Sequence, residues 1–212
     1  MIKHIIFDFD GTIADSKDSA VKLLNELAEK HKYQKINKEK LEYLRTLSFV
    51  DRCKAINLPL YKIPMLKLEL TKDYRKIINN FGLIEGIGNI IVQLKEADYG
   101  ISIISSNSVD NINLFLNNHN IKMFDNIFSS NNLFGKDKTL SNFLNKYALK
   151  KNEVIYIGDE YRDVVACKKT GIKIIAVAWG YDSRELLLKA VPDFFAQKPL
   201  DIIGIIESLK NK

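Results

Sequence analysis

The chain has only two cysteines, Cys53 and Cys167, which are too few for a disulfide framework or a cysteine-ligated zinc site. No apolar run approaches the roughly 18 residues that a membrane-spanning helix needs. The first ten residues, MIKHIIFDFD, lack the long apolar stretch and small-residue cleavage site of a secretory leader. These absences lead us to expect a globular protein of a reducing, cytoplasmic setting, with no membrane partner.

What remains is an ordinary globular composition of 212 residues, 46% apolar and 27% charged, with a formal net charge of +6. The excess lies in residues 16–80, which hold 15 Lys and Arg against 8 Asp and Glu. A solvated helical face, attraction of an anionic substrate and nucleic-acid binding would each explain it. No helix-turn-helix, zinc-finger or RNA-binding signature is present, so we expect no nucleic-acid partner.

Short apolar runs alternate with helical patterns along most of the chain. Runs at 3–7, 101–104, 154–157 and 172–178, with a weaker one near 126–129, are typical of buried strands. Segments with apolar residues at helical spacing separate them. Strands that alternate with helices predict an α/β fold, a Rossmann-like parallel sheet with helices on both faces.

Residues 16–80 break this alternation, because they show helical spacing and no strand pattern. Asn37 is a plausible cap for one helix, and Pro64 suits the start of another. Glycines flank the segment, with Gly11 before it and Gly82 directly after it, which would suit a hinge. We therefore predict a core domain of residues 1–15 and 83–212 and an inserted all-helical cap domain of residues 16–82.

Carboxylates follow two of the predicted strands. Asp8 and Asp10 come where the first strand ends, and Asp159 directly follows the strand at 154–157. Ligands of open parallel sheets bind beyond the carboxyl ends of the strands, and oxygen ligands suit magnesium. The plainer alternatives are that the Asp-x-Asp pair forms a turn and that Asp159 caps the next helix.

Hydroxyls and a lysine follow two other strands. Ser105 and Ser106 end the run at 101–104, where hydroxyls and free N–H groups before a helix can hold a phosphate. The alternative is a simple serine cap. Lys136 and Lys138 lie on the segment after the weaker run near 126–129, where a lysine is most often solvated.

Taken together, the motifs resemble those of the haloacid dehalogenase superfamily of hydrolases. Their order is Asp-x-Asp-Gly-Thr at 8–12, then serine, then lysine, then Gly-Asp-x-x-x-Asp at 158–163. A helical insertion directly after the first motif is similar to the branch with a small helical cap, which includes phosphoglycolate phosphatase-like enzymes. The extension at 8–16, Trp179-Gly180-Tyr181 and Pro192-Asp193 also resemble that branch.

The resemblance implies a magnesium-dependent phosphatase that acts on a small phosphomonoester. Asp8 would be the nucleophile and form an aspartyl-phosphate, and Asp10 would be the general acid and base. Mg²⁺ would lie between Asp8, the backbone carbonyl of Asp10 and Asp159.

The resemblance also implies roles for residues around this centre. Ser105, Ser106 and Lys136 would hold the phosphate oxygens. Asp163 would orient magnesium-bound water or Lys136, and Thr12 would help to position Asp10. For the motif hydroxyl we prefer Ser105 over Ser106. For the motif lysine we prefer Lys136 over Lys138, although neither precedes the proline that is frequent in the family.

Within the family, Asp10 argues against a dehalogenase, which has no phosphate leaving group to protonate. The third position of the first motif argues against a phosphonatase. A phosphosugar mutase keeps both aspartates and stays open as an alternative, as does a non-catalytic relative that binds a phosphate ligand. The sequence does not predict the oligomeric state, since it shows no coiled-coil seam.

Two arginines of the insertion are candidates for substrate selection. Arg45 and Arg52 are seven residues apart and would share a face if one helix ran through both. With the basic excess of the insertion, they suggest that the partner is a small-molecule phosphate ester with a second anionic group.

Overall fold

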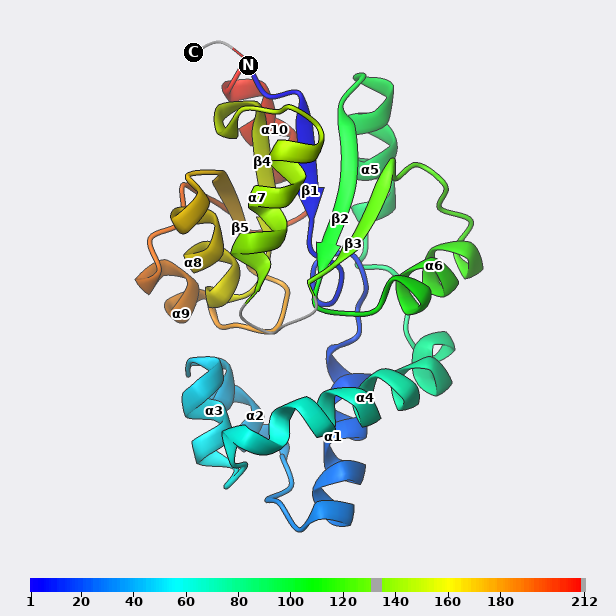
Figure 1. Cartoon of the computed structure of the whole chain (residues 1–212), viewed down its shortest axis with the longest axis vertical. Coiled ribbons are helices and arrows are strands. Elements are labelled where there is room, and N and C mark those ends of the chain that lie inside the picture. The colour runs from blue at the N-terminus through cyan, green and yellow to red at the C-terminus, as the bar shows by residue number, and fades with distance from the viewer. Residues whose placement is uncertain (131–134, 211–212) are drawn as a thin grey trace.

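A six-stranded parallel sheet forms the centre of the computed structural model, which describes residues 1–130 and 135–210 (Figure 1). Its strand order is β3-β2-β1-β4-β5-β6, and every neighbouring pair is parallel. The strands are β1 (His4–Phe7), β2 (Gly100–Ser105), β3 (Asn126–Ser129), β4 (Val154–Gly158), β5 (Lys173–Val177) and β6 (Phe194–Ala196). The α/β fold class predicted from the sequence is confirmed.

Helices cover both faces of this sheet. Helices α5, α6 and α10 pack on one face, and α7, α8 and α9 pack on the other. The helices with their bounds are α1 (Lys17–His31), α2 (Lys38–Arg45), α3 (Phe49–Ala55), α4 (Ile63–Ile77), α5 (Ile87–Glu96), α6 (Val109–Asn118), α7 (Lys136–Lys146), α8 (Tyr161–Thr170), α9 (Arg184–Lys189) and α10 (Asp201–Ser208), with short 3-10 turns η1 (Leu60–Lys62), η2 (Ile78–Asn80) and η3 (Lys151–Glu153).

Strand β1 shows why the sheet needs cover on both sides. Successive side chains of a strand point to opposite faces. Ile5 and Phe7 therefore pack in the cluster that contains α5 and α6, whereas Ile6 packs in the cluster that contains α7 and α8. All three are fully buried. A continuous apolar run is the pattern of a parallel strand buried on both faces, and it holds β1 at the middle of the sheet.

Helices α1 to α4 lie together beyond one end of the sheet, separate from the helices that flank it (Figure 1). Residues 16–82 contain these helices and no strand. The predicted helix starts are found there. Asn37 accepts a hydrogen bond from the amide of Lys40, and Pro64 lies in the first turn of α4. We retain the division into a core domain and a cap domain at 16–82 as a proposal.

The two segments that connect the insertion to the sheet are paired with each other. Ala14 and Leu83 form an antiparallel bridge. The amide of Asp15 donates to Gly82, and the amide of Ile84 donates to Ile13, each at 2.9 Å. The chain therefore enters and leaves the insertion through a hydrogen-bonded neck.

Strand β6 is the one part of the sheet that the apolar runs did not indicate. It has only three residues, and Asp193 immediately before it accepts a hydrogen bond from the amide of Ile174 at 3.0 Å.

Among the described residues, no helix combines the length and the apolar character that crossing a membrane requires.

Candidate active site

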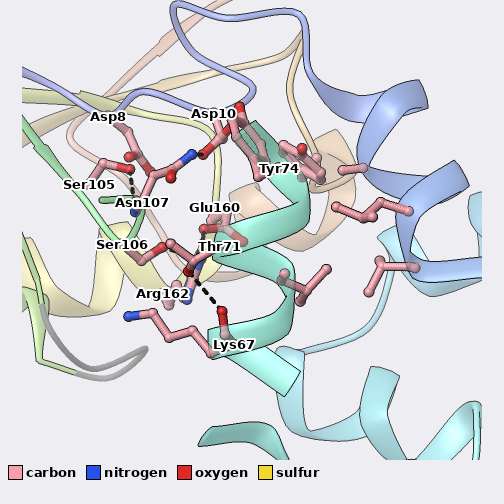
Figure 2. Close-up of a pocket in the computed structure, with 15 residues that line it drawn as sticks. Asp8, Asp10, Lys67, Thr71, Tyr74, Ser105, Ser106, Asn107, Glu160 and Arg162 are labelled. Carbon is pink, nitrogen blue, oxygen red and sulfur yellow. Dashed lines mark hydrogen bonds and ion pairs between the residues drawn. The ribbon is translucent and has the colours of Figure 1, made fainter. Parts of the chain in front are cut away.

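The parallel register brings the ends of the central strands to one edge of the sheet. Phe7 of β1 lies beside Ile103 of β2 and Ile157 of β4. Asp8 is therefore the first residue beyond β1, and its amide donates to the carbonyl of Ile157 at 2.8 Å. At this edge a cavity of about 210 Å³ opens between the sheet and the inserted helices (Figure 2).

Asp8 lies at the floor of this pocket with only 3% of its surface exposed. Its Oδ2 is 2.8 Å from Nζ of Lys136, and its Oδ1 accepts a hydrogen bond from the amide of Phe9 at 2.7 Å. Burial opposes ionisation, but the Lys136 ammonium and the amide outweigh it and lower the pKa of Asp8. Asp8 is thus held as a carboxylate.

Lys136 is the first residue of α7, and it is buried. Besides Asp8, its ammonium forms an ion pair with Asp163 of α8. Burial alone would lower the pKa of Lys136, but the two carboxylates raise it instead. Lys138, the alternative lysine, is exposed. The structure therefore places Lys136, and not Lys138, at the site.

Asp10 is held by three donors from different parts of the chain. Its Oδ1 accepts hydrogen bonds from the hydroxyls of Ser16, at 2.8 Å, and Tyr74. Its Oδ2 accepts one from Nδ2 of Asn107 at 2.9 Å. Burial raises the pKa of Asp10 despite these donors, and the nearby charge of Asp8 adds to the effect. A raised pKa suits a carboxyl group that must carry a proton.

None of these three donors was among the residues selected from the sequence. Ser16 lies in the extension of the first motif, and Asn107 directly follows the two serines, so both had a local signal. Tyr74 had none beyond helical spacing in α4, because its approach to Asp10 depends on how the insertion packs on the core.

Both candidate hydroxyls of the second motif line the pocket. Ser105 ends β2 and is buried, and its Oγ accepts a hydrogen bond from the amide of Asn107 at 3.3 Å. Oγ of Ser106 accepts one from Arg162 at 3.3 Å. The cap of helix α6 is Ser108, so Ser105 and Ser106 are available for the pocket.

Asp159 and Thr12 form a contact just outside the pocket. Thr12 donates its hydroxyl to Oδ1 of Asp159 at 2.8 Å, and the amide of Tyr181 donates to Oδ2 at 2.7 Å. Gly11, at φ +74°, passes so close that a Cβ there would lie 2.4 Å from Oδ2 of Asp159. Thr12 therefore contacts Asp159, and its role in positioning Asp10 stays a prediction.

The carboxylates that face one another are a different set from the predicted one. Oxygen atoms of Asp8, Glu160 and Asp163 lie within 4.8 Å of one another, a spacing that suits one metal ion. Glu160 follows Asp159 directly, and it lines the pocket whereas Asp159 does not. Adjacency to Asp159 was the only sequence signal for Glu160.

The electrostatics of the site favour a bound cation. Three cations, Lys67, Lys136 and Arg162, stand against five acidic residues, Asp8, Asp10, Asp159, Glu160 and Asp163. Burial and then the neighbouring carboxylates raise the pKa of Asp159 well above its ordinary value. Burial raises the pKa of Asp163 to about 7, against the pull of Lys136. A site of buried carboxylate oxygens with excess negative charge fits a hard divalent ion such as Mg²⁺.

The insertion supplies the other wall of the pocket. Tyr74, Thr71 and Lys67 come from α4 (Figure 2). Leu23 and Leu24 also line the pocket and come from α1. The hydroxyl of Thr71 donates to the carbonyl of Lys67 at 2.7 Å. The wall that faces the carboxylates is therefore mixed, with an apolar side from α1 and a polar side from α4.

Arg45 and Arg52 do not line this pocket. Arg45 donates to the carbonyl of Tyr181 at 3.1 Å, and Arg52 forms an ion pair with the buried carboxylate of Asp182. No single helix runs through both arginines, because α2 ends at Arg45 and Ser48 caps α3. The structure thus uses them to join the insertion to the 180–182 loop of the core.

The profile of the haloacid dehalogenase-like hydrolase family matches residues 5–177. Because this match covers most of the chain, the chain belongs to that family, as the order of motifs predicted.

Individual proteins agree with this assignment over the whole length. The phosphoglycolate phosphatase of Synechococcus elongatus is 29% identical over 212 residues, which are 100% of each chain. Pyrophosphatase PpaX of Listeria welshimeri is 25% identical over 215 residues, covering 97% of this chain and 96% of the relative. The crystal structure of a predicted phosphatase from Clostridium acetobutylicum has a TM-score of 0.83 at 19% identity, covering 98% of this chain and 99% of the other. That likeness shows the fold.

Proposed function

We propose that this protein is a magnesium-dependent phosphatase that hydrolyses a small phosphomonoester through an aspartyl-phosphate intermediate. The family and the phosphatase relatives place it among the phosphoric monoester hydrolases. The observation that carries the proposal is Asp8, an ionised carboxylate 2.8 Å from Lys136 at the floor of a pocket, with Asp10 close by.

In the first step, a carboxylate oxygen of Asp8 attacks phosphorus, and the bond from phosphorus to the ester oxygen breaks. Asp10 donates its proton to the leaving oxygen, which departs as an alcohol. In the second step, Asp10 takes a proton from water as the water attacks the aspartyl-phosphate. Inorganic phosphate leaves, and Asp8 is again a carboxylate.

The phosphate needs positive charge and donors where its oxygens lie. Lys136 brings a cation against Asp8, and the hydroxyls of Ser105 and Ser106 line the same pocket. Arg162, which donates to Ser106, adds a second cation on that side. These groups are fixed before the substrate arrives, so they stabilise the charge of the transition state without reorganising.

Asp8 and the carboxylates of the fourth motif, Asp159, Glu160 and Asp163, would hold Mg²⁺ together with the backbone carbonyl of Asp10. The ion, when bound, offsets the repulsion between the Asp8 carboxylate and the anionic phosphate. The sequence motif predicts Asp159 as a metal ligand, whereas the spacing of the carboxylates favours Glu160.

The test is the hydrolysis of para-nitrophenyl phosphate by the wild-type protein and by Asp8→Asn. We expect turnover with Mg²⁺, loss of turnover in EDTA, and a fall of at least a thousandfold in Asp8→Asn. Asp110→Asn is the matched control, because Asp110 is exposed on α6 and should keep full activity. Full turnover in Asp8→Asn, or turnover unaffected by EDTA, would contradict the proposal.

A further inference from the structure

A second cavity, of about 270 Å³, lies inside the insertion and against the core. Most of its wall is apolar and comes from all four inserted helices, including Leu27 of α1, Leu44 of α2, Cys53 of α3 and Leu66 of α4. These four side chains are buried. We call this space the cap cavity.

The cap cavity adjoins the catalytic pocket, and six residues, three of them charged, line both spaces. Leu24 of α1, Leu70 of α4 and Arg162 of α8 line both spaces. Figure 2 shows Arg162 beside Glu160 and Ser106, on the side of the pocket toward Lys67. A phosphate held over Asp8 would therefore direct the rest of its ester toward the inserted helices.

The arginines that line the cap cavity form hydrogen bonds and ion pairs with other residues of the protein. Arg52 pairs with Asp182, Arg45 bonds to the 180–182 loop, and Arg162 donates to Glu160 at 2.6 Å. The leucines of the inserted helices offer dispersion contacts to a ligand, whereas Lys67 and Glu160 bring charge where the cavity adjoins the catalytic pocket. Such a leucine-rich wall favours the binding of apolar ligands, because the apolar surface of the ligand is removed from water when it binds.

The size of the cavity indicates what it would hold. An apolar cavity of roughly 150 Å³ stays dry and holds a benzene ring. The cap cavity is larger, and a two-carbon leaving group bound over Asp8 would leave it unfilled.

From the shared lining residues, the size of the cavity and its leucine-rich wall, we propose that the cap cavity receives the leaving group of the substrate. The protein would then favour phosphomonoesters of apolar alcohols, with a medium-length alkyl chain or an aromatic ring. This inference rests on the proposed phosphatase function. The reaction is the same: Asp8 forms its bond to phosphorus, the ester bond breaks, Asp10 protonates the leaving oxygen, and the apolar alcohol occupies the cavity.

The experiment measures kcat/KM for ethyl, butyl and hexyl phosphate, 1-naphthyl phosphate and phosphoglycolate. We expect kcat/KM to rise about threefold for each added methylene up to hexyl phosphate. Hexyl and naphthyl phosphate should both exceed phosphoglycolate, and 1-hexanol should inhibit competitively. A flat series from ethyl to hexyl, with phosphoglycolate the best substrate, would overturn the inference.

A cavity-filling variant adds a second readout. Ala28 lies buried on α1 at the wall of the cap cavity, away from the catalytic pocket. Ala28→Leu should lower kcat/KM for hexyl phosphate about tenfold and leave that for ethyl phosphate within twofold, which also shows that the variant is folded. Equal turnover of hexyl phosphate by both proteins would contradict the assignment. Failure of the wild type to hydrolyse any ester, para-nitrophenyl phosphate included, would instead contradict the phosphatase function.

Discussion

The hydroxyl of Tyr74, on the inserted helix α4, donates a hydrogen bond to Oδ1 of Asp10, which follows strand β1 of the sheet. This contact joins the proposed general acid to the part of the chain that covers it. Burial and the charge of Asp10 raise the pKa of Tyr74 well above its ordinary value, so the hydroxyl keeps its proton and remains a donor.

Tyr74→Phe tests what this contact does. The substitution removes one of three donors to Asp10 and keeps the ring, so we expect kcat to fall roughly 10- to 100-fold, since hydrogen bonds to charged groups contribute about 1.5–3 kcal/mol. KM should change little. Steady-state kinetics on para-nitrophenyl phosphate measures both. Tyr61→Phe is the control, because Tyr61 is 79% exposed. An unchanged kcat in Tyr74→Phe would show that the contact does not assist Asp10.

Lys136→Met should reduce both activity and stability. It removes the cation shared by Asp8 and Asp163 and leaves two buried carboxylates unpaired. Breaking a buried pair in this way costs about 3–5 kcal/mol. Urea unfolding in EDTA measures the free energy of unfolding. Lys138→Met, at an exposed position, should leave it within about 0.5 kcal/mol. The hypothesis that Lys138 is the motif lysine requires the reverse order of effects.

Two variants distinguish the candidate metal ligands. If Glu160 binds Mg²⁺ directly, Glu160→Gln should raise the Mg²⁺ concentration for half-maximal activity far more than Asp159→Asn does. If Asp159 is the ligand, the order reverses. We expect an effect of at least tenfold for the true ligand, and the rise in melting temperature with added Mg²⁺ should follow the same order. Asp137→Asn, outside the carboxylate cluster, should titrate as the wild type does.

Arg52→Ala should weaken the junction between the insertion and the core. Arg52 pairs with Asp182, whose other oxygen accepts a hydrogen bond from the amide of Tyr161 at 2.6 Å. Because the Asp182 carboxylate is buried, we expect a loss of about 2 kcal/mol in the free energy of unfolding. The ratio of kcat/KM for phosphoglycolate and ethyl phosphate should stay constant. A selective rise in KM for phosphoglycolate would restore the sequence-based hypothesis that Arg52 recognises an anionic substrate. Lys54→Ala on the same helix is the control.

His4 makes stability depend on pH. Burial lowers the pKa of His4 below 6.5, and its Nε2 is 2.9 Å from Oγ of Ser102. The unfolded chain therefore binds more protons at this group than the folded protein does, so its contribution is complete above about pH 6.5 and is lost as the pH falls below that. Melting temperatures from pH 5 to 8 should show a shallower decline for His4→Gln. Parallel curves for the two proteins would contradict this.

The sequence predicted the parts of the site that lie close to strand ends. Asp8 and Ser105 could be selected because a strand end is a local pattern and parallel strands share one edge. The positions of Tyr74 and Arg52 could not be predicted in the same way. Each contacts a residue far away in the chain, through packing between the insertion and the core that no local spacing encodes.

The fourth motif, at residues 158–163, shows that a sequence pattern does not always identify which of two neighbouring residues faces a site. Asp159 and Glu160 are neighbours, and a sequence pattern cannot say which side chain turns toward Asp8. That choice is made by Thr12 and the amide of Tyr181, which hold Asp159 outside the pocket. Strand β6 was missed for a related reason, since three residues are too few for a period to be visible and Asp193 fixes the strand from outside it.

The neck at Ala14 and Leu83 links the placement of the insertion to the hydrogen bonds that Asp10 accepts. Its two segments are hydrogen-bonded to each other, and the chain enters α1 shortly after the first and leaves α4 shortly before the second. Two hydroxyls near the neck donate hydrogen bonds to Oδ1 of Asp10. Ser16 lies just after the segment of Ala14, and Tyr74 lies on α4, which precedes the segment of Leu83. Moving α4 away from the core would take the Tyr74 hydroxyl from Asp10 and open the pocket to water, whereas Ser16 also bonds to Tyr181 of the core. The proposed general acid would keep all three of its donors only while α4 lies against the core, so its orientation would depend on a closed pocket.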